Sequence, residues 1–127
     1  MAKKPSVGIV AGAPDEGGVL VISESVLEEI AHTEAMRTEG VVPPLEGMVQ
    51  GMLRRRTSRG VRMTISGNEV AFHLTIGVRD GVRMPEVAAA VRGRVAGAVR
   101  SKTGYAVRSV DVLIDHVAVE DERAKDS

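Results

Sequence analysis

The segment 61–78 constrains the fold of this chain more than any other part of the sequence. Apolar and polar residues alternate along 61–66 (VRMTIS), and the alternation resumes along 70–78 (VAFHLTIGV). A period of two is typical of a β-strand that buries one face. The Gly67-Asn68 pair between the two runs can supply the positive φ angles of a tight turn. The segment therefore predicts an antiparallel hairpin with one apolar face and one polar face.

Two segments with helical periodicity lie on either side of the hairpin. In the first, Ser23 can cap the helix N-terminus and Gly40 is a suitable end. Its predicted apolar stripe consists of Val26, Leu27, Ile30 and Ala31. In the second, Pro85 suits the first turn and Gly104 suits the end. Its predicted stripe consists of Val87, Val91, Val95 and Val99, with Ala88 and Ala98.

Apolar runs at 19–23 and 107–119 complete a β-α-β-β-α-β order. In the last run, Val110, Val112 and Ile114 share one face. The predicted fold class is α+β, a two-layer sandwich in which two helices cover one face of a small mixed sheet. The other sheet face stays open and carries Arg62, Thr64, Ser66, His73, Thr75, Asp111, Leu113 and Asp115.

A chain of 127 residues has room for one domain. We predict a flexible N-terminal tail over 1–18, the α+β domain over 19–119 and a charged C-terminal tail over 120–127. Within the domain, 42–60 is interpreted as a mobile basic insert. It is either a marginal amphipathic helix or a loop, because the glycines in it weaken a helix.

Composition narrows the classes of function. Aromatic residues make up 2% of the chain, so it has almost no platforms on which bases could stack. The absence of cysteine removes disulfides, thiolate nucleophiles and zinc–sulfur sites, and it fits a reducing cytoplasm. No apolar run approaches the roughly 18 residues of a membrane span. The N-terminus imitates a secretory signal, but its apolar part is short and diluted by glycine, so we expect a tail there.

The sequence contains no motif that assigns a reaction. It has no glycine-rich nucleotide cradle, and its three histidines lack the spacing of metal ligands, so we expect no cofactor and no metal site. His73 with Asp111 or Asp115 could imitate a hydrolytic triad across the open face. We prefer cross-strand polar pairing as the interpretation and predict no catalytic residues.

The charge of the chain is unevenly distributed. The net charge is zero, but the segment 54–108 holds twelve basic and three acidic residues. Guanidinium groups suit phosphates and carboxylates. We hypothesise a partner- or anion-binding site at Arg54, Arg55, Arg56, Arg59 and Arg62. The alternatives are a solvated loop whose apolar residues pack on the domain, and acidic and basic parts that face each other.

The second helix has unusually small residues on the side opposite its valines. Small side chains allow another backbone to approach closely, although in water this signal is weak. We hypothesise a self-association face at Ala89, Gly93, Ala96 and Gly97. An alanine-rich solvated face is the alternative.

Taken in order, three segments resemble the alkaline shock protein family of bacterial envelope stress-response proteins. VISESVLEEIAHTEAMRTEGVV (21–42) is similar to the family's opening strand and helix. SRGVRMTISGNEVAFHLTIGVRDGVRMPEVAAAVRGRVAGAVRSKTGYAVRSVDVLI (58–114) is similar to its core, and the basic insert between them resembles a variable insert of the family. The chain departs from the family's usual residues at Glu34, Asp80 and Asp111, where small residues, Tyr and Asn are common.

The resemblance implies a small cytoplasmic domain without established enzymatic activity. It further implies association with the membrane through a membrane-anchored protein partner, and homo-oligomers. We therefore expect a non-catalytic scaffold or interaction domain of the envelope stress response. One alternative is a nucleic-acid-binding module that uses the basic segment 54–108, which the scarcity of aromatic residues disfavours. The other is an accessory protein of lipid or acyl metabolism, with the open sheet face as half of a site.

Overall fold

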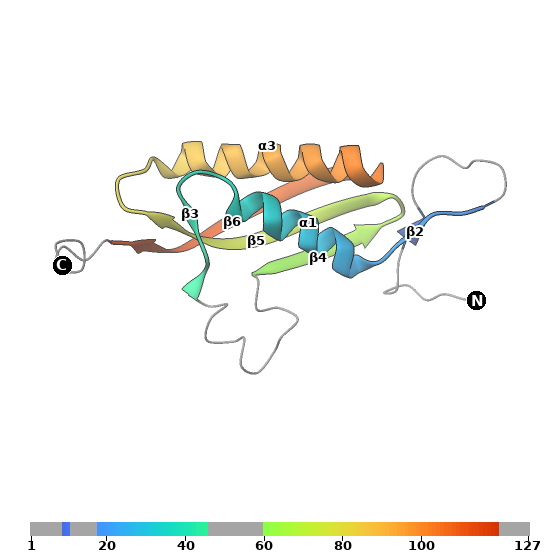
Figure 1. Ribbon diagram of the computed structural model, residues 1–127, viewed down its shortest axis with the longest axis horizontal. Helices are drawn as coiled ribbons and strands as arrows, with labels where there is room; N and C mark the ends of the chain where they lie inside the picture. The colour runs from blue at the N-terminus through green and yellow to red at the C-terminus, as the bar shows by residue number, and fades with distance from the viewer. Residues whose placement is uncertain (1–8, 11–17, 46–59, 120–127) are drawn as a thin grey trace.

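The computed structural model describes residues 9–10, 18–45 and 60–119 (Figure 1). The helices of this part of the chain are α1 (Glu24–Met36) and α3 (Met84–Thr103). The strands are β1 (Ile9–Val10), β2 (Val21–Ile22), β3 (Val41–Val42), β4 (Val61–Ser66), β5 (Glu69–Arg79) and β6 (Ala106–Ala118).

Strand β5 is the centre of the main sheet. It pairs in parallel with β6 along its whole length, from Glu69 opposite Ala106 to Arg79 opposite Ala118. On its other edge it pairs antiparallel with β4 and, further along, with β3. The sheet is therefore mixed, as predicted, with β6 on one side of β5 and β4 or β3 on the other.

Both helices cover the same face of this sheet. Alternate residues of β5 are at most 2% exposed, namely Val70, Phe72, Leu74, Ile76 and Val78. They form one apolar core with the buried residues of α1 and with the four predicted valines of α3. The two-layer α+β architecture is thus confirmed, and in the described part of the chain the other sheet face carries no helix (Figure 1).

The hairpin of β4 and β5 forms as the alternation predicts. Ser66 is opposite Glu69, so Gly67 and Asn68 make the turn. Gly67 has a φ of 63°, a conformation that glycine adopts at little cost. This turn fixes the register of the sheet, because each residue of β4 then has one defined partner on β5.

Strands β3 and β4 lie end to end on the same edge of β5. The last residue of β3, Val42, and the first residue of β4, Val61, are opposite β5 residues only three positions apart, Gly77 and Leu74. Gly60 fills the gap, because its carbonyl oxygen accepts a hydrogen bond from the N–H of β5 at Thr75, at 2.8 Å. Both ends of the predicted insert 42–60 therefore belong to the sheet edge, and the chain leaves and re-enters this edge at nearly the same place.

The predicted first strand does not join the main sheet. Only part of 19–23 forms a strand, and this strand, β2, pairs with β1 in a separate two-stranded sheet. Val19 and Leu20 are 70% and 52% exposed, and of the apolar residues in the run it is Ile22, 8% exposed, that joins the core. Strand β3 occupies the sheet in its place, and two residues are too few to reveal a period. Strand β1 lies within the segment 1–18, which we predicted as a tail.

Helix α1 begins where the sequence predicts but turns a slightly different side to the core. The Oγ of Ser23 accepts a hydrogen bond from the N–H of Ser25 at 3.1 Å, which confirms the predicted N-cap. Val26 is 45% exposed and lies outside the stripe. The buried residues are Leu27, Ala31, Glu34 and Ala35. A stripe that begins at Leu27 places Val26 about 100° away around the helix.

Helix α3 matches its prediction closely. Its buried residues are Val87, Val91, Val95, Val99 and Thr103. Pro85 lies in the first turn, and Gly104 caps the C-terminus with a φ of 83°, its N–H donating to the Arg100 carbonyl oxygen at 2.9 Å. The valine spacing of four residues therefore gives a helix that lies along the sheet with one continuous stripe.

Candidate functional site

The open face of the sheet presents a row of polar side chains across three strands. Arg62 of β4 is opposite His73 of β5, which is opposite Asp111 of β6. The Nδ1 of His73 lies 3.1 Å from the Oδ2 of Asp111, and the two side chains are 43% and 66% exposed. This is cross-strand polar pairing on a solvated surface, which is the interpretation the sequence favoured.

Strand β6 contains two β-bulges, and one of them lies at Asp115. Consecutive residues of β5 pair with Val107 and Ser109, and again with Ile114 and His116, so Arg108 and Asp115 are extra residues. A bulge shifts the side chains that follow it. Asp115 lies four residues beyond Asp111, which is opposite His73, and its carboxylate has a different partner.

That partner is His116, whose Nδ1 lies 2.7 Å from the Oδ1 of Asp115. The two side chains are 20% and 16% exposed, so this pair is more enclosed than the pair of His73. The His116 ring lies across Gly77, where an added Cβ would overlap the ring and lie 2.8 Å from a methyl carbon of Val42. Gly77 thus permits an imidazole to pack directly on the backbone of β5.

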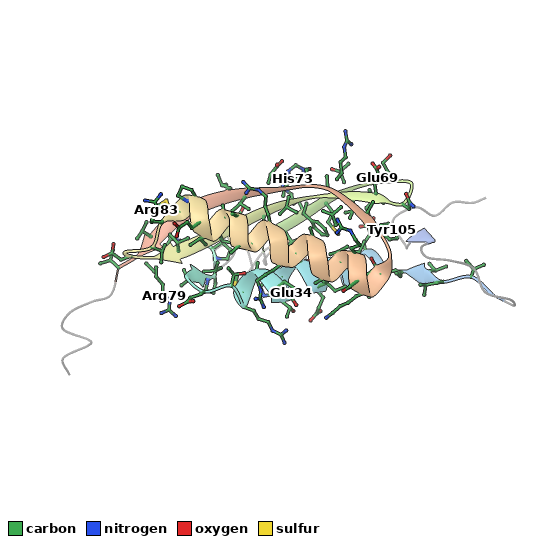
Figure 2. The ribbon with its side chains drawn as sticks, turned by 90° about the horizontal axis from the view of Figure 1, so that it is seen from above. Glu34, Glu69, His73, Arg79, Arg83 and Tyr105 are labelled. Atoms are coloured by element: carbon green, nitrogen blue, oxygen red, sulfur yellow. The ribbon has the colours of Figure 1, made fainter. Side chains whose placement is uncertain are left out.

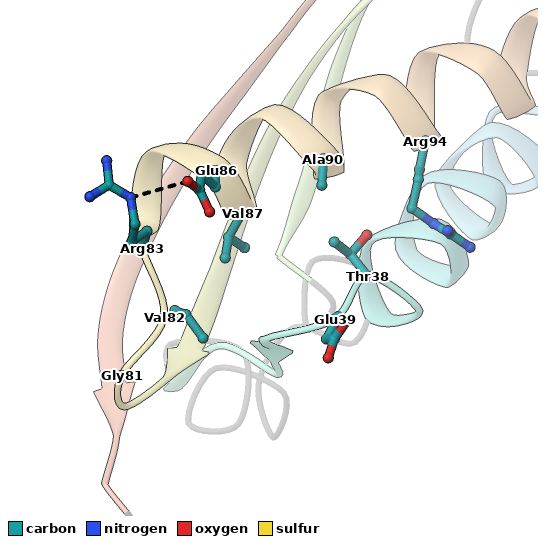
Figure 3. A pocket seen from close by; sticks show the side chains of 9 residues that line it. All are labelled: Thr38, Glu39, Gly81, Val82, Arg83, Glu86, Val87, Ala90 and Arg94. Carbon is teal, nitrogen blue, oxygen red and sulfur yellow. Dashed lines mark ion pairs between the residues drawn. The ribbon is translucent and has the colours of Figure 1, made fainter.

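A shallow groove of about 570 Å³ opens on the helix side of the molecule (Figure 3). The turn after α1 and the β5–α3 loop form its walls, and its lining includes Thr38, Val82, Val87 and Ala90. Three of the charged side chains along it, those of Arg83, Glu86 and Arg94, are engaged in ion pairs. Arg83 Nε lies 3.2 Å from Glu86 Oε2, and Arg94 lies 3.4 Å from Glu34.

Glu34 is the buried end of a small charge network between the helices. Its side chain is 11% exposed and lies 3.4 Å from Arg94 of α3 and 3.6 Å from Arg37 of its own helix. The sequence suggested no role for Glu34 beyond a departure from the family pattern. The structure shows that it links α1 to α3, since a buried carboxylate needs such partners.

The structure places the sequence-predicted residues on different surfaces. Arg62 is exposed on the open sheet face, whereas Arg54, Arg55, Arg56 and Arg59 lie outside the described residues. The predicted self-association face lies on α3, where Ala89, Gly93 and Gly97 are exposed and Ala96 is half-buried. A Cβ added at Gly93 or Gly97 would meet nothing within 4 Å. Arg62 and this face therefore lie on opposite layers of the domain.

The sequence analysis did not indicate any particular role for Tyr105. It follows the C-terminal cap of α3 (Figure 2), and its side chain is fully buried. Its hydroxyl has no hydrogen-bond partner. Burial raises the pKa of Tyr105 above its ordinary value of 10.0.

The described residues offer neither a metal-binding cluster nor a membrane-spanning helix. Within 9–10, 18–45 and 60–119, no three His, Asp or Glu side chains gather closely enough to hold a metal ion. In the same ranges, no helix combines the length and apolar character that crossing a membrane requires.

The geometry defines a small two-layer α+β domain whose mixed sheet has one open polar face. Residues 13–119 match the model of the alkaline shock protein family, which is described by a cell envelope-related function. The match spans most of the chain, so this protein belongs to that family and has a cell envelope-related role. The resemblance on which the sequence expectations rested is thereby confirmed.

Solved structures add a weaker likeness. A zinc form of one MamM CTD variant is 19% identical, with a TM-score of 0.43 over 79% of this chain and 89% of that one. A copper form of another MamM CTD variant is 20% identical, with a TM-score of 0.44 over 78% of this chain and all of that one, 100%. A likeness at this level carries no functional argument. Among curated proteins, none matches this sequence.

Proposed function

We propose that this chain is a non-catalytic interaction domain of the cell envelope, which docks to a membrane-anchored protein partner. The observation that carries the proposal is the open sheet face, a solvated surface of paired polar side chains opposite the helix layer. Family membership supplies the cellular setting. A rigid sheet with an exposed face is suited to binding another protein, because its side chains are held at fixed spacing.

The described ends of the basic insert, 42–45 and Gly60, lie at the edge of the same sheet, and we expect the insert to be the docking element. It leaves the sheet edge after β3 and returns at Gly60, next to β4, which carries the exposed Arg62. Arg54, Arg55, Arg56 and Arg59 belong to this insert. Guanidinium groups would then meet carboxylates or phosphates at the inner surface of a membrane, where each basic residue contributes about 1 kcal/mol.

The arrangement of charge favours this function over nucleic-acid binding. The described part of the basic segment, 60–108, is divided between the two layers, with Arg62 on the open face and Arg83 and Arg94 on the helix side. Arg83 and Arg94 are paired with carboxylates. A nucleic-acid-binding surface instead gathers its cations in one patch or stripe.

The test is affinity capture, after chemical cross-linking, from cells that express the chain natively. We expect the full chain to recover a membrane-anchored protein. Substituting glutamine for Arg54, Arg55, Arg56 and Arg59 should lower that recovery by about tenfold or more, as expected for several lost charge contacts. The matched control replaces four basic residues that are exposed on the domain, Arg92, Arg100, Lys102 and Arg108, by glutamine.

The control separates a specific role of the insert from a general effect of net charge. Both variants lose four positive charges, so a general effect of net charge would lower recovery equally in both. If the insert is the docking element, recovery should be unchanged in the control variant. Equal losses in the two variants would contradict docking through the insert. Recovery of nucleic acid alone, sensitive to nuclease, would replace the proposal by the nucleic-acid-binding alternative.

A further inference from the structure

Strand β6 forms a long outer edge of the main sheet. It runs for 13 residues, from Ala106 to Ala118, and pairs with β5 on one side. No described residue pairs with its other side. Proteins usually protect such an edge with proline, lysine or bulges, because its free N–H and C=O groups can pair with another strand.

The hydrogen bonds at the two ends of β6 show which of its backbone groups face outward. The Ala106 N–H donates to the Asn68 carbonyl oxygen at 3.0 Å, and the Asp80 N–H donates to the Ala118 carbonyl oxygen at 3.2 Å. Residues of β6 opposite odd-numbered residues of β5 therefore direct their backbone groups toward β5, and the residues opposite even-numbered ones direct theirs outward. Between the bulges at Arg108 and Asp115, the outward-facing residues are Val110, Val112 and Ile114.

The run between the bulges, 109–114, lacks the usual protection of an edge. It contains no proline and no lysine, and Asp111 is its single charged residue. On the open face, Leu113 is 58% exposed. On the helix side, Val112 and Ile114 are half-buried. An added strand would therefore cover apolar surface on both faces of the sheet while pairing with the free backbone groups.

The helix layer limits what kind of element can pair with this edge. Helix α3 packs over β6, whereas α1 packs over β3 and β4 (Figure 1). An added strand lies about 4.8 Å from β6, but two packed helices need about 8–10 Å between their axes. A helix that covered the added strand on this side would collide with α3. The element that fits is a single extended segment without a helix layer of its own on this side.

The outer side of α3 leaves room for the side chains of such a segment. Arg94 faces α1, because it forms an ion pair with Glu34. Ala96 lies about 200° further around the helix and therefore on the side away from α1. Its small side chain is half-buried. A methyl group at this position does not block the edge of β6.

Asp111 indicates the charge of the incoming segment. Its side chain is 66% exposed and ends the polar row of the open face, with His73 at 3.1 Å on its inner side. An opposite charge on an added strand, directly across from Asp111, is favourable. Membrane proteins carry an excess of lysine and arginine next to their spans on the cytoplasmic side. An extended basic segment beside a membrane span therefore complements the edge in both backbone and charge.

We propose that the outer edge of β6 binds an extended basic segment of the membrane-anchored partner as an added antiparallel strand. This deepens the function proposed above and rests on it. The segment places a lysine or arginine opposite Asp111 and an apolar residue opposite Leu113. Val110, Val112 and Ile114 each exchange two hydrogen bonds with the residue opposite. The backbone hydrogen bonds provide affinity, and the side chains of the open face provide specificity.

The first test removes one outward N–H from the full chain. Val112→Pro is compatible with an edge strand because the lost N–H points away from β5. Val112→Ala is the matched control, since it shortens the side chain and keeps the N–H. In affinity capture after cross-linking, we expect Val112→Pro to recover the membrane-anchored protein at least about tenfold less than wild type, and Val112→Ala within about twofold of wild type. Circular dichroism checks the fold of each variant.

The second test reads the charge opposite Asp111 and does not depend on proline. The probe is a short fluorescent peptide that alternates threonine and valine, with its central threonine replaced by lysine or by glutamate. By fluorescence polarisation with the full chain, we expect the lysine peptide to bind at least about threefold more tightly than the glutamate peptide. Asp111→Lys should reverse this preference. Asp80→Lys is the matched control, because it makes the same charge change at an exposed residue of the β5–α3 turn and should keep the preference.

The outcomes separate this inference from the function on which it rests. Equal recovery by wild type and a folded Val112→Pro would refute pairing at β6 and leave the docking function standing. Absence of peptide binding, or a preference that responds equally to Asp111→Lys and Asp80→Lys, would also refute it. A preference reversed by Asp111→Lys alone, with no membrane-anchored protein captured by wild type, would establish the strand site and overturn both its assigned partner and the proposed function.

Discussion

Replacing Tyr105 by phenylalanine tests whether the core contains an unpaired hydroxyl. The Tyr105 side chain is fully buried, and its hydroxyl has no hydrogen-bond partner. Burying a hydroxyl without a partner costs roughly 1–3 kcal/mol. The missing oxygen leaves a void on the order of 10 Å³, which costs about 0.2 kcal/mol at about 24 cal/mol per Å³. We therefore expect Tyr105→Phe to raise the free energy of unfolding by about 1 kcal/mol.

The assay is urea unfolding followed by far-UV circular dichroism. Fluorescence is unsuitable because Tyr105 is the sole tyrosine and the chain has no tryptophan. The gain corresponds to a rise in Tm of about 4 °C for a domain of this size. Tyr105→Leu is the matched control. It removes the ring together with the hydroxyl and should therefore destabilise the protein. A loss of about 1 kcal/mol or more in Tyr105→Phe would show that the hydroxyl has a partner and refute the reasoning.

The same substitution has a dependence on pH. The folded-state pKa of Tyr105 is raised by burial, so the unfolded chain, with its pKa of 10.0, ionises first as pH rises. The part of the wild-type free energy of unfolding that depends on a neutral Tyr105 is fully present below the unfolded-state pKa. It is lost as pH rises toward and through the folded-state pKa. We expect the advantage of Tyr105→Phe to grow above pH 10. A constant advantage from pH 8 to 11 would contradict the assigned cause.

Two further substitutions test other parts of the structure. Gly77→Ala should destabilise the domain by about 1–3 kcal/mol, because a Cβ there overlaps the His116 ring. In urea unfolding the cost should shrink in a His116→Ala background, and equal costs in both backgrounds would refute the packing. Gly93→Glu combined with Ala96→Glu tests the predicted self-association face on α3 by light scattering. An unchanged mass in solution would end that hypothesis.

The fold was predictable from the sequence wherever periodicity and turn residues agree. The alternation from Val61 to Val78 and the valines of α3 each specify one buried side, and that side is buried in the structure. The N-cap at Ser23 and the C-cap at Gly104 follow from local chemistry. In these segments, local preference and tertiary packing point to the same conformation.

The parts that could not be predicted depend on contacts between distant segments. Strand β3 has two residues, and its place is set by pairing with β5 about 36 positions further along the chain, a distance that no local pattern encodes. Val26 matched the helical stripe by type, but the stripe is defined by where α1 touches the sheet. The same limit applies to the pairing of β2 with β1, which removed the first predicted strand from the main sheet.

The candidate site was predictable in its face and less so in its partners. Alternation alone placed Arg62, His73 and Asp111 on the open side, and the structure joins the last two. The alternation pattern does not show where a strand carries an extra residue. The sequence therefore could not indicate the bulge at Asp115 or the pairing of Asp115 with His116. The unpaired hydroxyl of Tyr105 likewise depends on what surrounds it in three dimensions.

The end-to-end placement of β3 and β4 has an evolutionary consequence. Pro44 and Gly60 lie close together at the junction of β3 and β4, since a Cβ added at Gly60 would lie 3.1 Å from the Pro44 ring. Lengthening a loop with fixed ends costs only about 0.6 kcal/mol per doubling of its length. The segment between Pro44 and Gly60 can therefore be replaced, lengthened or shortened while the sheet keeps its register. Changes in this segment would let relatives of this protein acquire different binding partners without any compensating change in the core.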